Sequence, residues 1–159
     1  MKSTHFIDKK TILLFTMNIF WMFVIFYFSA QPAQESSQMS GFVKDCIDKV
    51  VSLLFNGNMP GIFTENKQLI EHLVRKLGHV TEYLILGLLT GASLRKLTPK
   101  KAALIALAVC VIYASSDEFH QIFVNGRGPS VTDVLLDSAA SAVGVCIIKF
   151  RKAHVRNSL

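Results

Sequence analysis

The chain has 159 residues, a length typical of one domain. Its hydrophobic content of 51% and its mean hydropathy of +0.41 are too high for an ordinary soluble domain of this size. The net charge of +6 does not lead us to expect a nucleic-acid partner, because the basic residues are laid out as in a membrane protein.

Four apolar segments are long enough to cross a bilayer, which takes about 20 residues, with a range of about 17–25. They cover residues 11–28, 77–94, 102–119 and 131–148. We predict an all-α, four-transmembrane-helix bundle in one integral membrane domain over residues 1–159. The alternative is a soluble bundle of buried helices, but it would leave little polar surface. The first segment is longer than the apolar core of a signal peptide, about 7–15 residues, so we expect it to be retained.

The basic residues border the predicted spans on one side. They precede the first span, separate the second from the third, and follow the fourth: Lys2, Lys9, Lys10, Arg95, Lys96, Lys100, Lys101, Lys149, Arg151, Lys152 and Arg156. Cytoplasmic segments of membrane proteins carry such an excess of Lys and Arg. The N and C termini are therefore predicted to be cytoplasmic in a multi-pass protein.

Between spans one and two the sequence predicts an external amphipathic helix. A polar stretch over residues 31–38 indicates a turn, and Ser40 or Gly41 is a candidate cap. Apolar residues then recur at helical spacing from Phe42 to Phe55, with charged residues on the other face. We interpret this helix as lying on the outer membrane surface; packing over the span bundle is the alternative.

A second break and a longer helix follow. Residues 56–61 carry Gly, Asn and Pro, which indicates a turn, and Thr64 is a plausible N-cap. The apolar stripe after it continues into span two, which predicts one long helix starting near Glu65. Spans two and four also carry small-residue patterns, GxxxG at 87–91 and a Ser/Ala/Gly face over 138–144, which support a tight bundle.

Ionisable residues lie at the outer ends of spans two, three and four. They are Lys76, His79 and Glu82 with Tyr83; Asp117, Glu118, His120 and Gln121; and Asp133 and Asp137. Such groups are costly within a membrane and indicate function. Their spacing of three or four residues places each set on one helix face. We therefore predict that the three faces converge on one pocket open to the outside.

The loop before span four adds Arg127, between Gly126 and Gly128. An arginine above a helix N-terminus suits phosphate binding. The alternative is that Arg127 simply pairs with Asp133 or Glu118. Ser130 is predicted to cap the fourth span, with Asp133 in the place of the glutamate of a capping box.

Three functions are compatible with these residues. The first is binding or movement of an anionic lipid-linked molecule, held by Lys76 and Arg127. The second is a membrane hydrolase or transferase, with His79 or His120 as general base and Glu82, Asp117 or Glu118 orienting it. The third is a non-catalytic envelope partner. No cofactor is required; a divalent metal would take its ligands from the set His79, Glu82, Asp117 and His120.

At these positions the chain resembles the VanZ-like family of small membrane proteins. The matching residues are Lys76, His79, Glu82, Tyr83, Leu86, Gly87, Asp117, Glu118, His120, Gln121, Phe123, Arg127, Asp133 and the stretch 137–144, with Ser29 to Pro32 after span one. One departure is Asp137, where the family often has asparagine, which adds a negative charge. The resemblance implies a bacterial plasma-membrane protein that contributes to glycopeptide resistance, to teicoplanin more than vancomycin. It implies a membrane lipid or lipid-linked cell-wall precursor as the partner.

Overall fold

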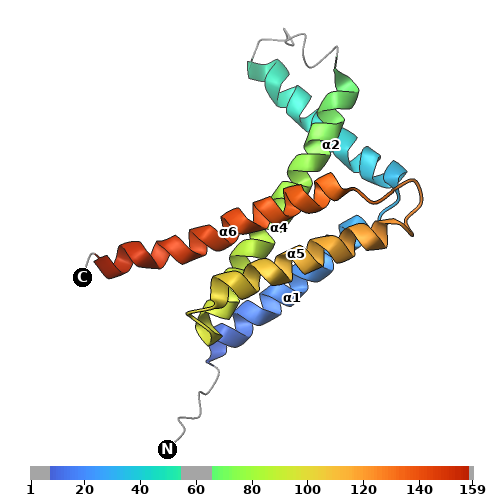
Figure 1. Ribbon diagram of the computed structural model, residues 1–159. Coiled ribbons are helices and arrows are strands. Elements are labelled where there is room, and N and C mark those ends of the chain that lie inside the picture. Colours follow the sequence, from blue (N-terminus) through green and yellow to red (C-terminus); the bar gives the residue numbers. More distant parts are fainter. Residues whose placement is uncertain (1–7, 55–65, 158–159) are drawn as a thin grey trace, which may run out of the picture.

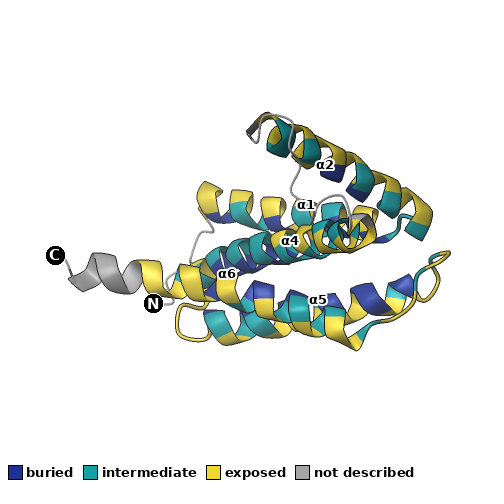
Figure 2. Ribbon diagram, turned by 90° about the horizontal axis from the view of Figure 1, so that it is seen from above, coloured by how far each residue is buried: buried dark blue, intermediate teal, exposed yellow. Residues whose placement is uncertain are grey.

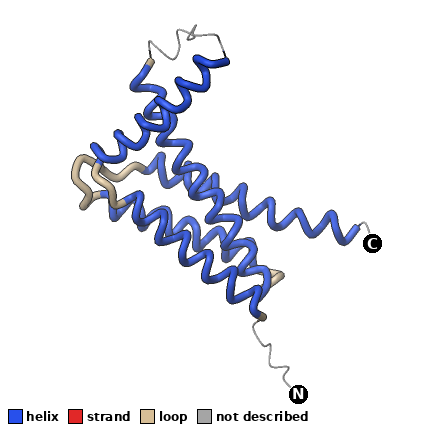
Figure 3. Tube along the Cα trace, turned by 180° about the vertical axis from the view of Figure 1, so that it is seen from behind, coloured by secondary structure: helices blue, strands red, loops and turns tan. Residues whose placement is uncertain are grey.

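Helices make up the ordered framework of the computed structural model, which describes residues 8–54 and 66–157. Within these two ranges there is no strand (Figure 3). The helices are α1 (Lys9–Ser29), α2 (Ala33–Leu54), α4 (Lys67–Leu97), α5 (Ala102–Gln121) and α6 (Val131–Asn157).

Four helices are long and apolar enough to cross a membrane. The candidate spans are Lys9–Ser29, Gln68–Leu97, Ala102–Gln121 and Val131–Arg151, and they contain the four predicted segments. The all-α, four-span architecture is therefore confirmed. Large apolar side chains such as Phe23 and Leu104 are exposed on the outside of these helices, as expected for surfaces that meet lipid. The cytoplasmic location of the termini remains a prediction.

The central helix of the bundle is α4, which contacts α1, α2, α5 and α6 (Figures 1 and 2). Its closest approach is to α6, at two glycines. A Cβ at Gly87 would lie 2.8 Å from the Cα of Ser141, and a Cβ at Gly144 would lie 2.8 Å from the backbone nitrogen of Leu88. Because only hydrogen fits at these positions, the small-residue patterns bring the two backbones together.

The predicted turn over residues 31–38 is wrong for most of its length, because α2 already begins at Ala33. The carbonyl of Pro32 accepts the first helical hydrogen bond from the Ser36 amide, at 3.0 Å. Proline suits a helix start, since it has no N–H to leave unpaired there and its φ is already helical. Gly41 consequently lies inside the helix and does not cap it.

Beyond α1, the chain forms a helical pair in which α2 lies crosswise over the first half of α4 (Figures 1 and 3). The break predicted at 56–61 and the Thr64 cap lie outside the described residues. The predicted long helix is confirmed: α4 starts at Lys67, after Asn66, and continues without interruption through the membrane span. We refer to the part of the bundle that carries α2 as the α2 end.

Candidate functional site

Three of the span helices bring ionisable side chains together at the α2 end. His79 and Glu82 come from α4, Asp117 from α5 and Asp137 from α6; we call these four residues the acidic cluster. Asp137 is fully buried, Asp117 is 3% exposed, and Nδ1 of His79 lies 3.7 Å from Oδ2 of Asp137. Glu82 and Asp117 are close enough to act on the charge of His79. The predicted convergence of three helix faces is found for these four residues.

In the part of the chain that the structure describes, several buried polar atoms of the acidic cluster lack hydrogen-bond partners. Among the described residues, neither carboxylate oxygen of Asp117 or Asp137 receives a hydrogen bond, and Nδ1 of His79 has none either. A buried carboxylate without partners is unfavourable by several kcal/mol in a protein or bilayer interior. The cluster therefore needs a proton, a ligand or its own imidazole to balance its charge.

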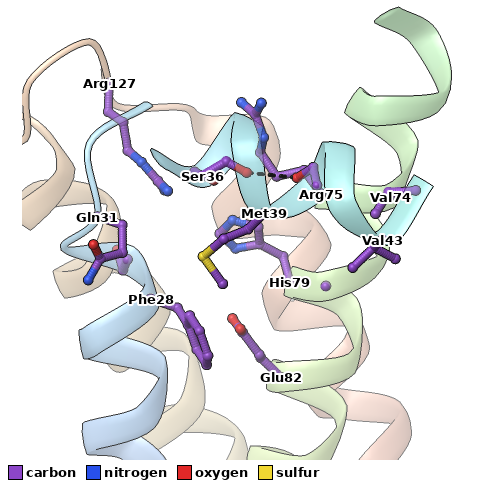
Figure 4. A pocket seen from close by; sticks show the side chains of 13 residues that line it. Phe28, Gln31, Ser36, Met39, Val43, Val74, Arg75, His79, Glu82 and Arg127 are labelled. Carbon is purple, nitrogen blue, oxygen red and sulfur yellow. Dashed lines mark hydrogen bonds between the residues drawn. The ribbon is translucent and has the colours of Figure 1, made fainter. Parts of the chain in front are cut away.

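A pocket of about 220 Å³ lies beside this cluster (Figure 4). Its walls come from the end of α1, from α2, from α4 and from the loop before α6, and include Phe28, Met39, Arg75, His79, Glu82 and Arg127. Helices α5 and α6 contribute no lining residue. The pocket thus differs from the predicted three-helix one, because α2 covers α4 at this point and the acids of α5 and α6 stay behind His79 and Glu82.

Two arginines lie at one side of the pocket (Figure 4). Nη2 of Arg75 donates a hydrogen bond to Oγ of Ser37 on α2, at 2.7 Å. Arg127 follows Gly126, whose φ of 74° favours glycine, and this turn holds it over the pocket. Burial, and then the charge of Arg75, lower the pKa of Arg127. Within the described ranges neither arginine makes an ion pair.

The carboxylates proposed as alternative partners of Arg127 are engaged elsewhere. Asp133 pairs with Lys76, so Lys76 ties α4 to α6 instead of lining the pocket. Glu118 accepts a hydrogen bond from the Ser130 amide, at 2.7 Å. Ser130 does cap α6, accepting from the Asp133 amide at 3.3 Å. The reciprocal bond of the expected capping box comes from Glu118 on α5, because Asp133 is turned toward Lys76.

His120 and Gln121 face α1 and do not line the pocket. The His120 ring lies 4.6 Å from that of Phe26 between centroids, and Gln121 donates to Oγ of Ser29 at 3.1 Å. Their spacing from Asp117 does place them on one helix face, but that face is shared between two neighbouring helices. They connect α5 to α1.

Sequence reasoning missed Arg75 and the α2 wall. A signal for Arg75 was present, since Arg75, His79 and Glu82 are spaced by four and three residues and share a face. No comparable signal pointed to Met39, because the residues before Phe42 were assigned to a turn.

Metal binding was left open for His79, Glu82, Asp117 and His120. In residues 8–54 and 66–157, no three His, Cys, Asp or Glu side chains are arranged to hold a metal ion. The His120 ring lies against that of Phe26 on α1. What the arrangement offers chemically is an anion site with two guanidinium groups, and an imidazole backed by a carboxylate.

The sequence was compared with protein families, curated proteins and solved structures. The family model described as VanZ/LLP1 matches residues 14–152, which is most of the chain and includes all four candidate spans from within α1 onward. No curated protein and no solved structure matches significantly.

Proposed function

Because the chain belongs to the VanZ/LLP1 family of membrane proteins, we propose that it binds the phosphate-bearing head of an anionic membrane lipid or lipid-linked cell-wall precursor. The proposed site is the pocket at Arg75 and Arg127. We further propose that the pocket faces the outside of a bacterial plasma membrane, where such binding contributes to tolerance of teicoplanin-type glycopeptides or to envelope homeostasis.

The observation that carries this proposal is the pair of arginines. Both line the same 220 Å³ pocket, and neither makes an ion pair within the described residues. Guanidinium groups bind phosphate oxygens in bidentate fashion, and partial burial strengthens such charge-assisted bonds. The pocket has room for a headgroup but not for a long hydrocarbon chain, which fits a ligand that stays anchored in the membrane.

The acidic cluster gives the site a second property. Glu82 and His79 line the pocket near the arginines, and Asp137 and Asp117 lie behind them. A bound dianion and several carboxylates cannot all keep their charge in one buried volume. Ligand binding is therefore expected to be accompanied by proton uptake at the cluster.

One observation favours a second function, hydrolysis or transfer on the same lipid. His79 lines the pocket and has the Asp137 carboxylate 3.7 Å behind it, an arrangement that can orient a general base. In that case Arg75 and Arg127 stabilise charge that develops on the phosphate. A water nucleophile fits better than Ser40 or Ser29, because the hydroxyl of Ser40 donates to the carbonyl of Ser36 and that of Ser29 accepts from Gln121.

Binding can be measured with purified protein in nanodiscs and a radiolabelled polyprenyl phosphate, with the matching polyprenol as the uncharged control. We expect Arg127→Gln to weaken binding by about 10–150-fold, since a hydrogen bond to a charged group contributes about 1.5–3 kcal/mol. Arg151→Gln, which removes one charge at the far end of α6, should leave affinity within about twofold. Unchanged binding by folded Arg127→Gln would refute the site.

Product analysis of the same samples separates the two functions. Release of labelled phosphate, abolished by His79→Gln, would indicate an enzyme, whereas recovery of intact ligand would indicate binding alone. In cells, Arg127→Gln should lower teicoplanin tolerance to that of a deletion strain at equal membrane levels of protein.

A further inference from the structure

The polar and apolar faces of α2 are placed the opposite way round from those of a helix on a water-soluble protein. On the side toward α4, Ser40 and Lys44 are 7% and 4% exposed. Elsewhere around the helix six large side chains are exposed, two of which, Met39 and Val43, also line the pocket. We call the six the apolar stripe: Met39, Phe42, Val43, Ile47, Val50 and Leu53. Phe42 is 71% exposed and Leu53 80%.

The face of α2 toward α4 is polar, and one hydrogen bond connects it to α4. Lys44 forms an ion pair with Asp48 one turn along the helix, on the face toward α4. Ser37, on the same face, receives the hydrogen bond from Arg75. Turning α2 to bury the apolar stripe would break the contact between Arg75 and Ser37. Within residues 8–54 and 66–157, Phe42 and Leu53 of the stripe are left 71% and 80% exposed.

Lipid is the occupant that the surroundings favour. Helix α2 begins at Ala33, only four residues after the span α1 ends at Ser29, so it starts at the membrane boundary. The last turns of the span α1 also expose large side chains, including Tyr27 (64%), so apolar surface is present on both sides of the short connection between α1 and α2. Full exposure of such side chains to water is unfavourable by about 1.5–3 kcal/mol each.

The remaining flank of α2 supports the same orientation. Asp45 and Lys49 are exposed and lie between the apolar stripe and the face toward α4, on the side away from Met39 and Val43. The pocket lies at the other flank, because it is lined by Met39 and Val43, which also belong to the stripe. One flank of the helix is thus charged, whereas Met39 and Val43 on the other line the pocket that Arg75 and Arg127 also line (Figure 4).

We propose that α2 is inserted sideways into the adjacent leaflet, with the apolar stripe in contact with lipid chains, and that it forms the lipid-facing wall of the pocket. The pocket then opens to the leaflet past Met39 and Phe28. A bound lipid keeps its chain in the bilayer and places its head at the arginines. The insertion of α2 is independent of the proposed function, whereas the route of the lipid chain rests on it.

Insertion can be tested by spin labelling of the full chain in liposomes. Nitroxides at Phe42→Cys and Val50→Cys are compared with Asp45→Cys, in a Cys46→Ala, Cys146→Ala background. We expect the two stripe labels to be relaxed by oxygen, which dissolves in lipid, and not by a water-soluble nickel chelate; the Asp45→Cys label should show the reverse. Nickel access to the stripe labels overturns the proposal. Spin–spin broadening that disappears on dilution into empty lipid would overturn it in favour of a second copy.

The route of the chain can be tested with a polyprenyl phosphate that carries a photoreactive diazirine next to the phosphate. We expect cross-links to Met39 and Phe28 that unlabelled polyprenyl phosphate competes away. Arginine-dependent binding with cross-links only on α5 or α6 would refute the route and leave the proposed function intact. No binding, with the spin labels still in lipid, would refute the proposed function and leave the insertion of α2 intact.

Discussion

Replacing Gly87 with alanine should weaken the packing of α4 on α6. The new Cβ would lie 2.8 Å from both Cα and the carbonyl carbon of Ser141, whereas non-bonded carbons are comfortable at about 3.5–4.0 Å. The carbonyl oxygen of Ser141 would lie closer still. No rotamer change relieves a contact with backbone, so the helices must separate by at least roughly 0.7 Å. A gap of this size loses about a quarter to a half of the dispersion energy of each affected contact. We expect the free energy of unfolding to fall by about 1–3 kcal/mol.

The measurement is SDS-driven unfolding in mixed micelles, followed by circular dichroism. Gly78→Ala is the matched control, because it makes the same change in the same helix where nothing lies within 4 Å. Alanine is the better helix former by about 1 kcal/mol, so the control should be neutral or stabilising. The reasoning from close backbone contact is wrong if the free energy of unfolding of Gly87→Ala is within about 0.5 kcal/mol of the wild-type value. It is also wrong if Gly78→Ala is equally destabilised.

The same contact bears on the site. Oγ of Ser141 donates to the carbonyl of Tyr83 at 3.0 Å, and Asp137 lies one helical turn before Ser141. Separation of α4 from α6 should therefore lengthen the 3.7 Å approach of His79 to Asp137. We expect Gly87→Ala to bind polyprenyl phosphate more weakly than the wild type does.

Two further predictions concern single carboxylates. Asp137→Asn should raise the free energy of unfolding at pH 8 by about 1–3 kcal/mol. It replaces a fully buried carboxylate whose oxygens receive no hydrogen bond in the described residues. A loss of stability in the SDS assay would instead identify His79–Asp137 as a stabilising ion pair. Hydrogen bonds from the Thr11 side chain, and then from its amide, lower the pKa of Asp8, the N-cap of α1. The cap therefore stabilises the first turn above the unfolded pKa of about 3.9 and is lost as the pH falls through the lower folded value. Hydrogen exchange of that turn should be faster in Asp8→Ala at pH 7 and should converge with the wild type in acid; a difference that persists in acid would contradict the charge-based cap.

The four spans and the long α4 could be read from the sequence for a simple reason. A bilayer has no water to satisfy backbone polar groups, so an apolar segment of sufficient length has to be a helix. Charged side chains are likewise confined to the ends of the spans, because a charge in the bilayer core is energetically costly. Hydropathy alone therefore placed the acidic cluster at one end of the bundle, before any contact was known.

The partners of the polar groups depended on the tertiary structure. Helical spacing assigned Lys76 and His120 to the right faces, but each face borders two neighbours. Lys76 pairs with Asp133, which leaves Arg75 and Arg127 as the pocket cations. The spacing of residues along the sequence gives the direction of each side chain around its own helix axis. Which side chains pair between helices also depends on where the neighbouring helices lie.

For α2 the periodicity separated an apolar face from a polar one, and this much the sequence determined alone. Which face turns inward is a different question, because in a membrane both a polar and an apolar environment are available. The answer came from the tertiary structure, in which Ser37 receives a hydrogen bond from Arg75 of α4 and Lys44, paired with Asp48 of its own helix, is buried. The sequence determines which face of each helix is apolar and which is polar. Only the packed structure determines which neighbour or environment each face meets.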